Sequence, residues 1–215
     1  MTYEGLRLKI LALKRIKLAN IRKKKINKEK FTIISNNCWG GEVYESYNLI
    51  KQSPTIGLFF MASDYIKFIK NIHYYLDQPL KFIDPQTSTN IDYFENDKFY
   101  GNYPVAKLGD IEIFFMHYKS EKEVIQKWNR RVKRINWDHI LYKFNDQNGC
   151  TLKEIKEFSE LPVKHKICFT VRKDFEKYSN VVRVKSPKSH SFVYASYEPF
   201  GNNKDVNVNE LINSL

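Results

Sequence analysis

An apolar run of residues ends abruptly at Ser35 and gives way to small, amide and thiol side chains. Residues 31–41 read Phe-Thr-Ile-Ile-Ser-Asn-Asn-Cys-Trp-Gly-Gly, and polar helix-forming residues follow over 42–51. We expect a buried strand over 31–35 and a helix over 42–51. A strand that feeds a helix through a glycine-containing turn is typical of an α/β sheet, with backbone N–H groups free at its carboxyl edge. The junction therefore predicts that residues 36–39 lie at the edge of a sheet.

Apolar strands and amphipathic helices alternate along the rest of the chain. Gly109-Asp110 lies between two apolar runs and predicts a β-hairpin, so part of the sheet should be antiparallel. The alternation predicts one α/β domain over 31–215, a three-layer α/β/α sandwich with a mixed, mostly parallel sheet. Further strands are expected at 55–61, 79–83, 105–108, 111–118, 139–144, 167–171 and 181–184. Further helices are expected at 64–76, 120–134, 151–161 and 207–215, with a long loop over 84–103.

Basic residues are concentrated at the amino terminus. Residues 1–30 contain eleven Lys and Arg against two Glu, which accounts for +9 of the formal net charge of +12. A dedicated nucleic-acid-binding protein usually spreads its basic surface over the folded domain, so we do not expect a nucleic-acid partner. We predict a basic N-terminal arm or helix (1–30). The favoured interpretation is a solvated or packed helix that keeps the chain in solution. The alternative is contact with an anionic membrane surface, which attracts basic segments.

Cysteine content and hydropathy indicate the compartment. The three cysteines match neither a disulfide framework nor a zinc site in their spacing, so we expect free thiols in a reducing compartment. No apolar stretch approaches the roughly 20 residues of a membrane span. The amino terminus also lacks the cleavage site of a signal peptide. These features predict a cytoplasmic protein, located at the inner face of the plasma membrane if the arm binds lipid.

Four polar segments follow predicted strands. Right-handed crossovers between parallel strands would bring their carboxyl ends to one edge of the sheet. That edge should then collect residues 35–41, 63–64, 117–119 and 145–150. We therefore expect the chemistry of this protein at this edge.

A thiol and an imidazole on this edge form the first candidate site. Cys38 precedes a predicted helix, whose amino terminus lowers the pKa of a nearby thiol. His117 would act as its base, with Asp146 or Asp110 orienting the imidazole. The alternative is that Cys38 is a small buried apolar side chain and His117 a structural residue.

Two carboxylates separated by one residue form the second candidate site. Asp110 and Glu112 lie on the same face of a strand, where they would hold a divalent metal, Mn²⁺ or Mg²⁺, against the diphosphate of a nucleotide sugar. The alternative places Asp110 in the hairpin turn and makes Glu112 a cross-strand partner.

Amide and aromatic side chains form the third candidate site. Planar amides both donate and accept hydrogen bonds, which suits the hydroxyls of a sugar, and an aromatic ring stacks on the sugar ring. Asn-Gly within 145–151 is also an ordinary turn sequence. We predict that Trp39 stacks on the sugar ring and that the sugar hydroxyls are held by Asn36, Asn37, Asn145 and Asp146.

Basic residues surround Trp128 on the helix expected at 120–134. Lys119 and Arg130 would neutralise the phosphate of a leaving group. The alternative is a solvated helix face, with Glu121 and Glu123 as partners of opposite charge. The sequence contains neither a Walker loop nor a Gly-x-Gly-x-x-Gly motif, which argues against a P-loop NTPase or a dinucleotide enzyme.

Several blocks of this sequence resemble a bacterial family catalogued as domain of unknown function 1919, often labelled exopolysaccharide biosynthesis protein. The resemblance covers most of residues 31–185 and implies a three-layer α/β/α fold with a mixed sheet. It also implies a setting in capsule, exopolysaccharide or surface glycan assembly, and it carries no catalytic residues over. The blocks include IISNNCWGG at 33–41, SPTIGLFF at 53–60, DYIKF at 64–68, YPVAKLGDIEI at 103–113, HYKSE at 117–121, RINWD at 134–138 and KFNDQNGCT at 143–151.

Three functions remain open from the sequence. The first is a glycosyltransferase that acts on a nucleotide sugar or a lipid-linked glycan in surface polysaccharide synthesis. The second is an acyltransferase or hydrolase that uses Cys38 and His117 on a glycan. The third is a subunit that binds a glycan without turnover.

Overall fold

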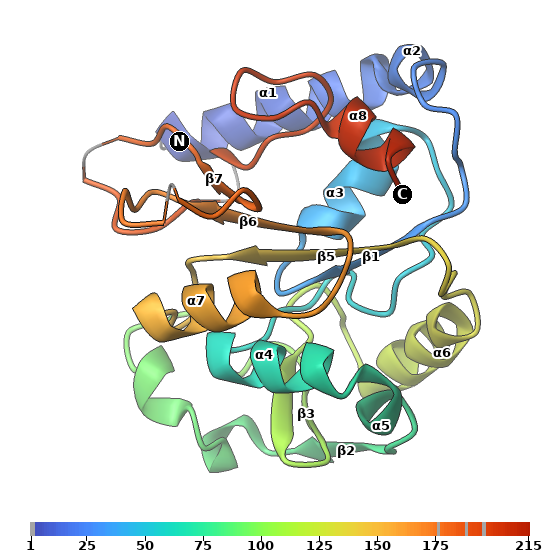
Figure 1. Ribbon diagram of the computed structural model, residues 1–215. Helices are drawn as coiled ribbons and strands as arrows, with labels where there is room; N and C mark the ends of the chain where they lie inside the picture. Colours follow the sequence, from blue (N-terminus) through green and yellow to red (C-terminus); the bar gives the residue numbers. More distant parts are fainter. Residues whose placement is uncertain (1–2, 176, 188, 195–196) are drawn as a thin grey trace.

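The computed structural model describes residues 3–175, 177–187, 189–194 and 197–215. Its larger sheet has four parallel strands in the order β1-β5-β6-β7 (Figure 1). These strands are β1 (Thr32–Ser35), β5 (Ile140–Asn145), β6 (Lys166–Thr170) and β7 (Val181–Arg183). The strands expected at 31–35, 139–144, 167–171 and 181–184 are therefore confirmed, with small shifts at their ends.

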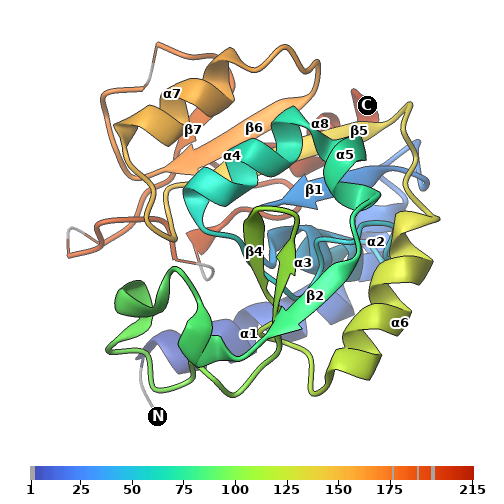
Figure 2. The ribbon, with the colours of Figure 1, turned by 90° about the horizontal axis from the view of Figure 1, so that it is seen from below.

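The predicted hairpin does not join this sheet, so the expectation of one mixed sheet is wrong. The hairpin forms a separate antiparallel sheet in the order β2-β3-β4 (Figure 2). Its strands are β2 (Leu80–Ile83), β3 (Val105–Leu108) and β4 (Ile111–Phe114). The part of the chain that the structure describes is thus an α/β fold with two sheets, one wholly parallel and one wholly antiparallel.

The segment 55–61 explains why the two sheets stay apart. It was expected to be a strand, but it forms only an isolated bridge between Phe59 and Phe114. Beside β1, the side chain of Thr55 accepts a hydrogen bond from the backbone N–H of Ser35 at 3.0 Å. Because a side chain takes this hydrogen bond, the backbone of β1 does not pair with a further strand on that side. The parallel sheet therefore does not continue into the hairpin. Gly57, with φ of +78°, also turns the backbone out of an extended conformation.

Among the described residues, eight α-helices surround the sheets, and two short 3₁₀ helices lie in the expected loop at 84–103. The helix expected at 64–76 is divided at Asn71, whose φ of −136° and ψ of 46° interrupt the helical backbone. Thr151 and Glu154 form the capping box expected at the start of α7. The helices are α1 (Tyr3–Lys17), α2 (Ala19–Lys23), α3 (Trp39–Ser46), α4 (Ala62–Lys70), α5 (Ile72–Leu76), α6 (Glu121–Val132), α7 (Leu152–Glu160) and α8 (Val208–Asn213).

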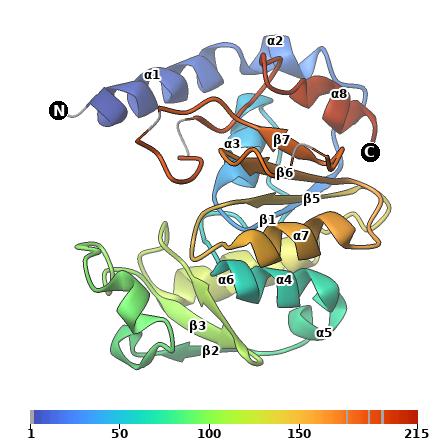
Figure 3. The same cartoon turned by 60° about the vertical axis from the view of Figure 1, so that its left-hand side comes forward.

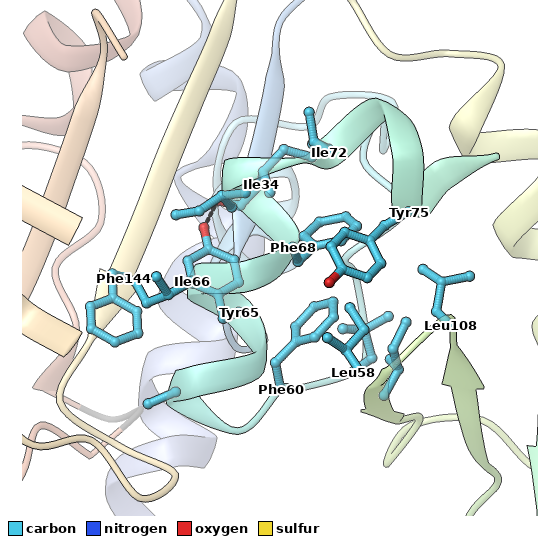
Figure 4. Close-up of a cluster of buried hydrophobic side chains, with 14 of the residues drawn as sticks. Ile34, Leu58, Phe60, Tyr65, Ile66, Phe68, Ile72, Tyr75, Leu108 and Phe144 are labelled. Carbon is cyan, nitrogen blue, oxygen red and sulfur yellow. Dashed lines mark hydrogen bonds between the residues drawn. The ribbon is translucent and has the colours of Figure 1, made fainter. Parts of the chain in front are cut away.

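Hydrophobic side chains pack on both faces of the parallel sheet. Ile33 belongs to a buried cluster with α3 and α8, whereas its neighbour Ile34 belongs to a cluster with α4 and α7. Successive residues of a strand point to opposite faces, so helices cover both sides of this sheet. Figure 4 shows the second cluster, in which the hydroxyl of Tyr65 donates to the carbonyl oxygen of Ile34 at 2.7 Å.

Helix α4 connects the two sheets. Tyr65 stacks on Phe144 of β5 with ring centroids 5.7 Å apart. On the other side, the carboxylate of Asp64 accepts a hydrogen bond from the backbone N–H of Glu112 in β4 at 3.0 Å. The antiparallel sheet is therefore held below α4 as an additional layer (Figure 3).

The basic arm is largely helical and lies against the rest of the protein. Helices α1 and α2 contact α3, and α1 forms one outer edge of the molecule (Figure 3). Among the residues that the structure describes, no helix is both long and apolar enough to cross a membrane.

Candidate functional site

The carboxyl ends of β1 and β5 bring two of the expected polar segments together. The side-chain amide of Asn36 donates to the side-chain oxygen of Asn145 at 2.8 Å. The backbone N–H of Ala62 donates to the carbonyl oxygen of Asn148 at 2.8 Å, so the start of α4 lies beside the same edge. Asp64 instead faces the antiparallel sheet, as its bond to Glu112 shows. This edge supports two adjoining features, a buried amide cluster and an open pocket.

A buried ion pair forms the centre of the amide cluster. Lys143 of β5 and Glu198 of the C-terminal segment pair with side chains that are 0% and 1% exposed. Asn37 Oδ1 accepts from Lys143 Nζ at 2.7 Å, and Asn145 Nδ2 donates to Glu198 Oε1 at 2.8 Å. Burial lowers the pKa of Lys143, and Glu198 opposes that shift. The amides supply the hydrogen bonds that a buried ion pair requires.

The predicted sugar-binding amides therefore bond to groups within the protein. Asn36, Asn37 and Asn145 are all buried, and Asn37 Nδ2 also donates to Gln147 Oε1 at 3.2 Å. Asn36 Oδ1 is a buried oxygen without a hydrogen-bond partner among the described residues. In this conformation the side chains of these amides are therefore engaged within the protein.

Asp146 and Trp39 also have partners within the protein. Asp146 accepts hydrogen bonds from the hydroxyl of Thr170 at 2.8 Å and from the backbone N–H of Val193 at 2.7 Å. Trp39 is buried, and its indole N–H donates to the carbonyl oxygen of Pro199 at 2.7 Å. In this conformation Asp146 anchors the C-terminal segment, and the ring of Trp39 contributes to the core instead of facing a ligand.

An open pocket of about 290 Å³ adjoins the cluster on the outer side of α3. Its volume lies just below the usual range of ligand pockets, about 300–1,000 Å³. Cys38 and His117 both line it, so the two members of the predicted dyad reach the same cavity. The lining residues are Arg15, Cys38, Gly41, Glu42, Glu45, Lys51, Ile56, Gly57 and His117.

A partly buried ion pair forms one wall of this pocket. Arg15 of α1 lies 3.0 Å from the carboxylate of Glu42 in α3. Burial nevertheless raises the pKa of Glu42 to about 7, because desolvation outweighs the opposing effect of Arg15. A carboxyl group in a cavity with a pKa near neutrality can both take up and release protons under physiological conditions.

The environment of Cys38 keeps its thiol protonated. Burial and the neighbouring carboxylates of Glu42 and Glu198 raise its pKa to about 12. Its sulfur donates to the carbonyl oxygen of Leu58 over 3.9 Å. Desolvation lowers the pKa of His117, which leaves its imidazole neutral at physiological pH. The expected effect of the α3 amino terminus is therefore outweighed by burial and negative charge.

Asp110 and Glu112 are engaged with different groups. Asp110 accepts from Lys67 at 2.9 Å and from the hydroxyl of Tyr75 at 2.7 Å. Glu112 is buried and accepts from the hydroxyl of Ser88 at 2.6 Å. Within the described part of the chain, no group of three or more His, Cys, Asp and Glu side chains is arranged to hold a metal ion. Asp110 lies in the turn between β3 and β4 and only Glu112 lies in a strand, so the expectation that both carboxylates share one face of a strand is wrong.

The predicted phosphate-binding residues lie on the surface. Lys119 and Arg130 are exposed. The neighbouring Arg131 is buried and donates to the hydroxyl of Tyr118 at 2.6 Å and to the carbonyl oxygen of Ile56 at 3.2 Å. The buried arginine of α6 thus supports Ile56, which lines the pocket.

Four residues of these two features were missed by the sequence analysis. Lys143 interrupts an otherwise apolar run, Ile-Leu-Tyr-Lys-Phe at 140–144, and a lysine within a buried strand is a signal that could have identified it. Glu42, Arg15 and Glu198 carry no such local signal. Each acquires its role through a contact with a distant segment.

Comparison with known proteins agrees with the resemblance found in the sequence. A protein family described as a domain of unknown function, DUF1919, matches residues 10–213, a range that includes Arg15. An uncharacterized protein of Haemophilus influenzae (strain ATCC 51907 / DSM 11121 / KW20 / Rd) is 33% identical over 162 residues, which cover 75% of this chain and 71% of the relative. The chain therefore belongs to the DUF1919 family.

Proposed function

We propose that this protein is a glycosyltransferase of surface polysaccharide synthesis, and that the pocket between α1, α3 and His117 receives the reacting sugar hydroxyl. The observation that carries the proposal is the position of Glu42, a partly buried carboxylate on the pocket wall with Arg15 at 3.0 Å. The resemblance to proteins labelled exopolysaccharide biosynthesis supports the choice of a sugar substrate.

Glu42 has the properties of a general base in this reaction. Its pKa of about 7 leaves about half of the molecules ionised at neutral pH. The ionised carboxylate takes the proton of the acceptor hydroxyl, whose oxygen then bonds to the anomeric carbon of the donor. The bond from that carbon to the donor phosphate breaks, and its electron pair leaves with the phosphate.

Basic groups around Glu42 suit the leaving group. Arg15 and Lys51, two basic side chains, line the same pocket. Such charges stabilise negative charge that develops on a departing phosphate. The volume of about 290 Å³ leaves the nucleotide or lipid part of the donor outside the pocket.

A cysteine-dependent acyl transfer is the second candidate, because Cys38 and His117 line the same pocket. The raised pKa of Cys38, about 12, argues against it, since the thiolate is the reactive form. Glu42 is therefore the better candidate for the proton-transfer step.

The proposal is tested by incubating the protein with a panel of nucleotide sugars, with and without Mn²⁺, and measuring release of the nucleoside phosphate. We expect release with at least one donor, and a 10²- to 10⁴-fold lower rate for Glu42→Gln. Glu157→Gln is the matched control. Glu157 lies on α7, away from the pocket, and forms an ion pair with Lys70 of α4 at 2.6 Å.

Three outcomes count against the proposal. No release and no thermal shift with any donor would remove its basis. A thermal shift without turnover would favour the glycan-binding subunit. Loss of activity in Cys38→Ser but not in Glu42→Gln would favour the cysteine-dependent reaction.

A further inference from the structure

Helix α1 is turned in an unusual way, with arginines facing the protein and apolar side chains facing outward. Arg7, Leu11 and Arg15 recur every four residues and so share one face of the helix. The guanidinium carbon of Arg7 lies 4.1 Å from the ring centroid of Tyr197, and Arg15 pairs with Glu42. The inward face of α1 is thus attached through cationic groups.

The outward face of α1 carries large apolar side chains. Each of them is between 45% and 73% exposed. They recur at intervals of three and four residues, so they share one side of the helix. The members of this outward face are Tyr3, Leu6, Ile10, Leu13 and Ile16. Figure 3 shows α1 at the edge of the molecule, with the rest of the chain on one side of it.

Lysines are interspersed with these apolar residues. Lys9 and Lys17 fall within the same face by helical spacing, and Lys14 borders it. All three are exposed. Helix α1 thus separates its basic residues, with arginines bound to the protein and lysines in solvent beside apolar side chains.

We infer that the outward face of α1 docks on the surface of an anionic lipid bilayer. A helix that lies in the membrane interface buries its apolar face about 5–10 Å into the boundary of headgroups and acyl chains. Basic residues at that level are attracted to anionic lipids. The outward face supplies both contributions from a single surface.

Other occupants fit this face less well. A second copy of the chain would bring Lys9 and Lys17 of both copies together, and like charges across an interface oppose association. A nucleic acid would use the lysines but would leave the apolar side chains exposed to water. An anionic bilayer accepts both kinds of side chain.

Docking would also place the pocket beside the membrane. Arg15 lines the pocket from the opposite side of the same helix, so one helix diameter, roughly 10 Å, separates the pocket from the lipid. A lipid-linked acceptor or donor is then within reach. This last step rests on the proposed function, whereas the docking itself does not.

Flotation with lipid vesicles tests the docking without any need for activity. The full chain is mixed with vesicles of phosphatidylcholine alone, or of phosphatidylcholine with one third phosphatidylglycerol. We expect binding to the anionic vesicles only, weakened by 0.5 M salt because salt screens the lysines. The triple variant Leu6→Asn/Ile10→Asn/Leu13→Asn should bind at least tenfold more weakly. Circular dichroism should show that its helices are retained, since these side chains face outward.

Neutralising the lysines gives a second, independent readout. Lys9→Gln/Lys14→Gln/Lys17→Gln should lose about fivefold in affinity per lysine, the equivalent of about 1 kcal/mol each. Lys122→Gln/Lys133→Gln/Lys156→Gln has the same net charge, with its changes at exposed positions on or next to α6 and α7. This control should bind as the unmodified chain does. Tyr74→Asn/Ile125→Asn/Leu152→Asn is the control for the apolar variant, because these residues are similarly exposed on α5, α6 and α7.

Three results would overturn the inference. The first is an absence of binding to anionic vesicles. The second is an equal loss of vesicle affinity in a variant and in its control. The third is a dimer, detected by sedimentation velocity, that the apolar variant abolishes. If vesicles bind but no sugar is transferred, the docking stands and only the proposed function fails.

Discussion

The guanidinium of Arg15 and the carboxylate of Glu42 lie 3.0 Å apart and join the N-terminal arm to α3. We expect Arg15→Gln to lower the free energy of unfolding by about 1–3 kcal/mol, because it leaves a partly buried carboxylate without its partner. Urea unfolding followed by circular dichroism measures this. Lys51→Gln is the control, since it removes an exposed pair with Glu45 and should cost less than about 1 kcal/mol. Equal effects of the two substitutions would show that Arg15 is not anchored as described.

The raised pKa of Glu42 makes stability depend on pH. Because the folded state holds this proton more tightly, the contribution is fully present below the ordinary pKa of 4.5 and is lost as the pH rises through about 7. We expect the unfolding free energy of the unmodified chain, measured relative to that of Glu42→Gln, to fall by on the order of 1–3 kcal/mol as the pH rises over that range. Denaturant titrations at half-unit pH steps measure it, and a difference that stays flat would contradict the assignment.

The ion pair between Lys143 and Glu198 should behave as a unit. Lys143→Met leaves an uncompensated buried carboxylate, so we expect it to cost about 3–5 kcal/mol. The double variant Lys143→Met/Glu198→Leu removes both charges and should recover most of that loss. Urea unfolding of the two single variants and the double variant gives the coupling energy. Additive losses would show that the two side chains do not interact.

The thiol of Cys38 should react slowly despite its position ahead of α3. Its pKa of about 12 leaves very little thiolate at pH 7.5, so iodoacetamide should modify it far more slowly in the folded chain than in urea. Mass spectrometry of tryptic peptides measures the rate at each cysteine. Cys168, which is fully buried, is the internal reference for a protected thiol. Rapid modification of Cys38 alone would revive the cysteine-dependent reaction.

The identity and order of the secondary-structure elements could largely be predicted from local patterns. The strand at 140–145, the hairpin around Gly109 and the capping box at Thr151 all depend on residues that are close in sequence. Such patterns act through backbone conformation and through burial of one face, which neighbouring residues determine. The segment at 55–61 is one exception, because it is apolar like a strand although Thr55 uses its side chain to bond β1.

The candidate site was predicted only in part. The edge formed by Asn36 and Asn145 follows from the parallel order of the strands, and Cys38 and His117 do reach one pocket. The role of each side chain there could not be predicted, because it depends on which distant group lies opposite. Asn37 was expected to bind a sugar, and it instead bonds Lys143.

The sequence by itself determined where most strands and helices form, that the chain contains an antiparallel hairpin, and that the amino terminus is strongly basic. Only the tertiary structure decided that the hairpin is a separate sheet and that Arg15 turns inward to Glu42 while the apolar side of α1 faces out. The physical reason is the range of the forces. Backbone conformation and capping act within a few residues, whereas ion pairing and desolvation depend on contacts between segments far apart in the chain.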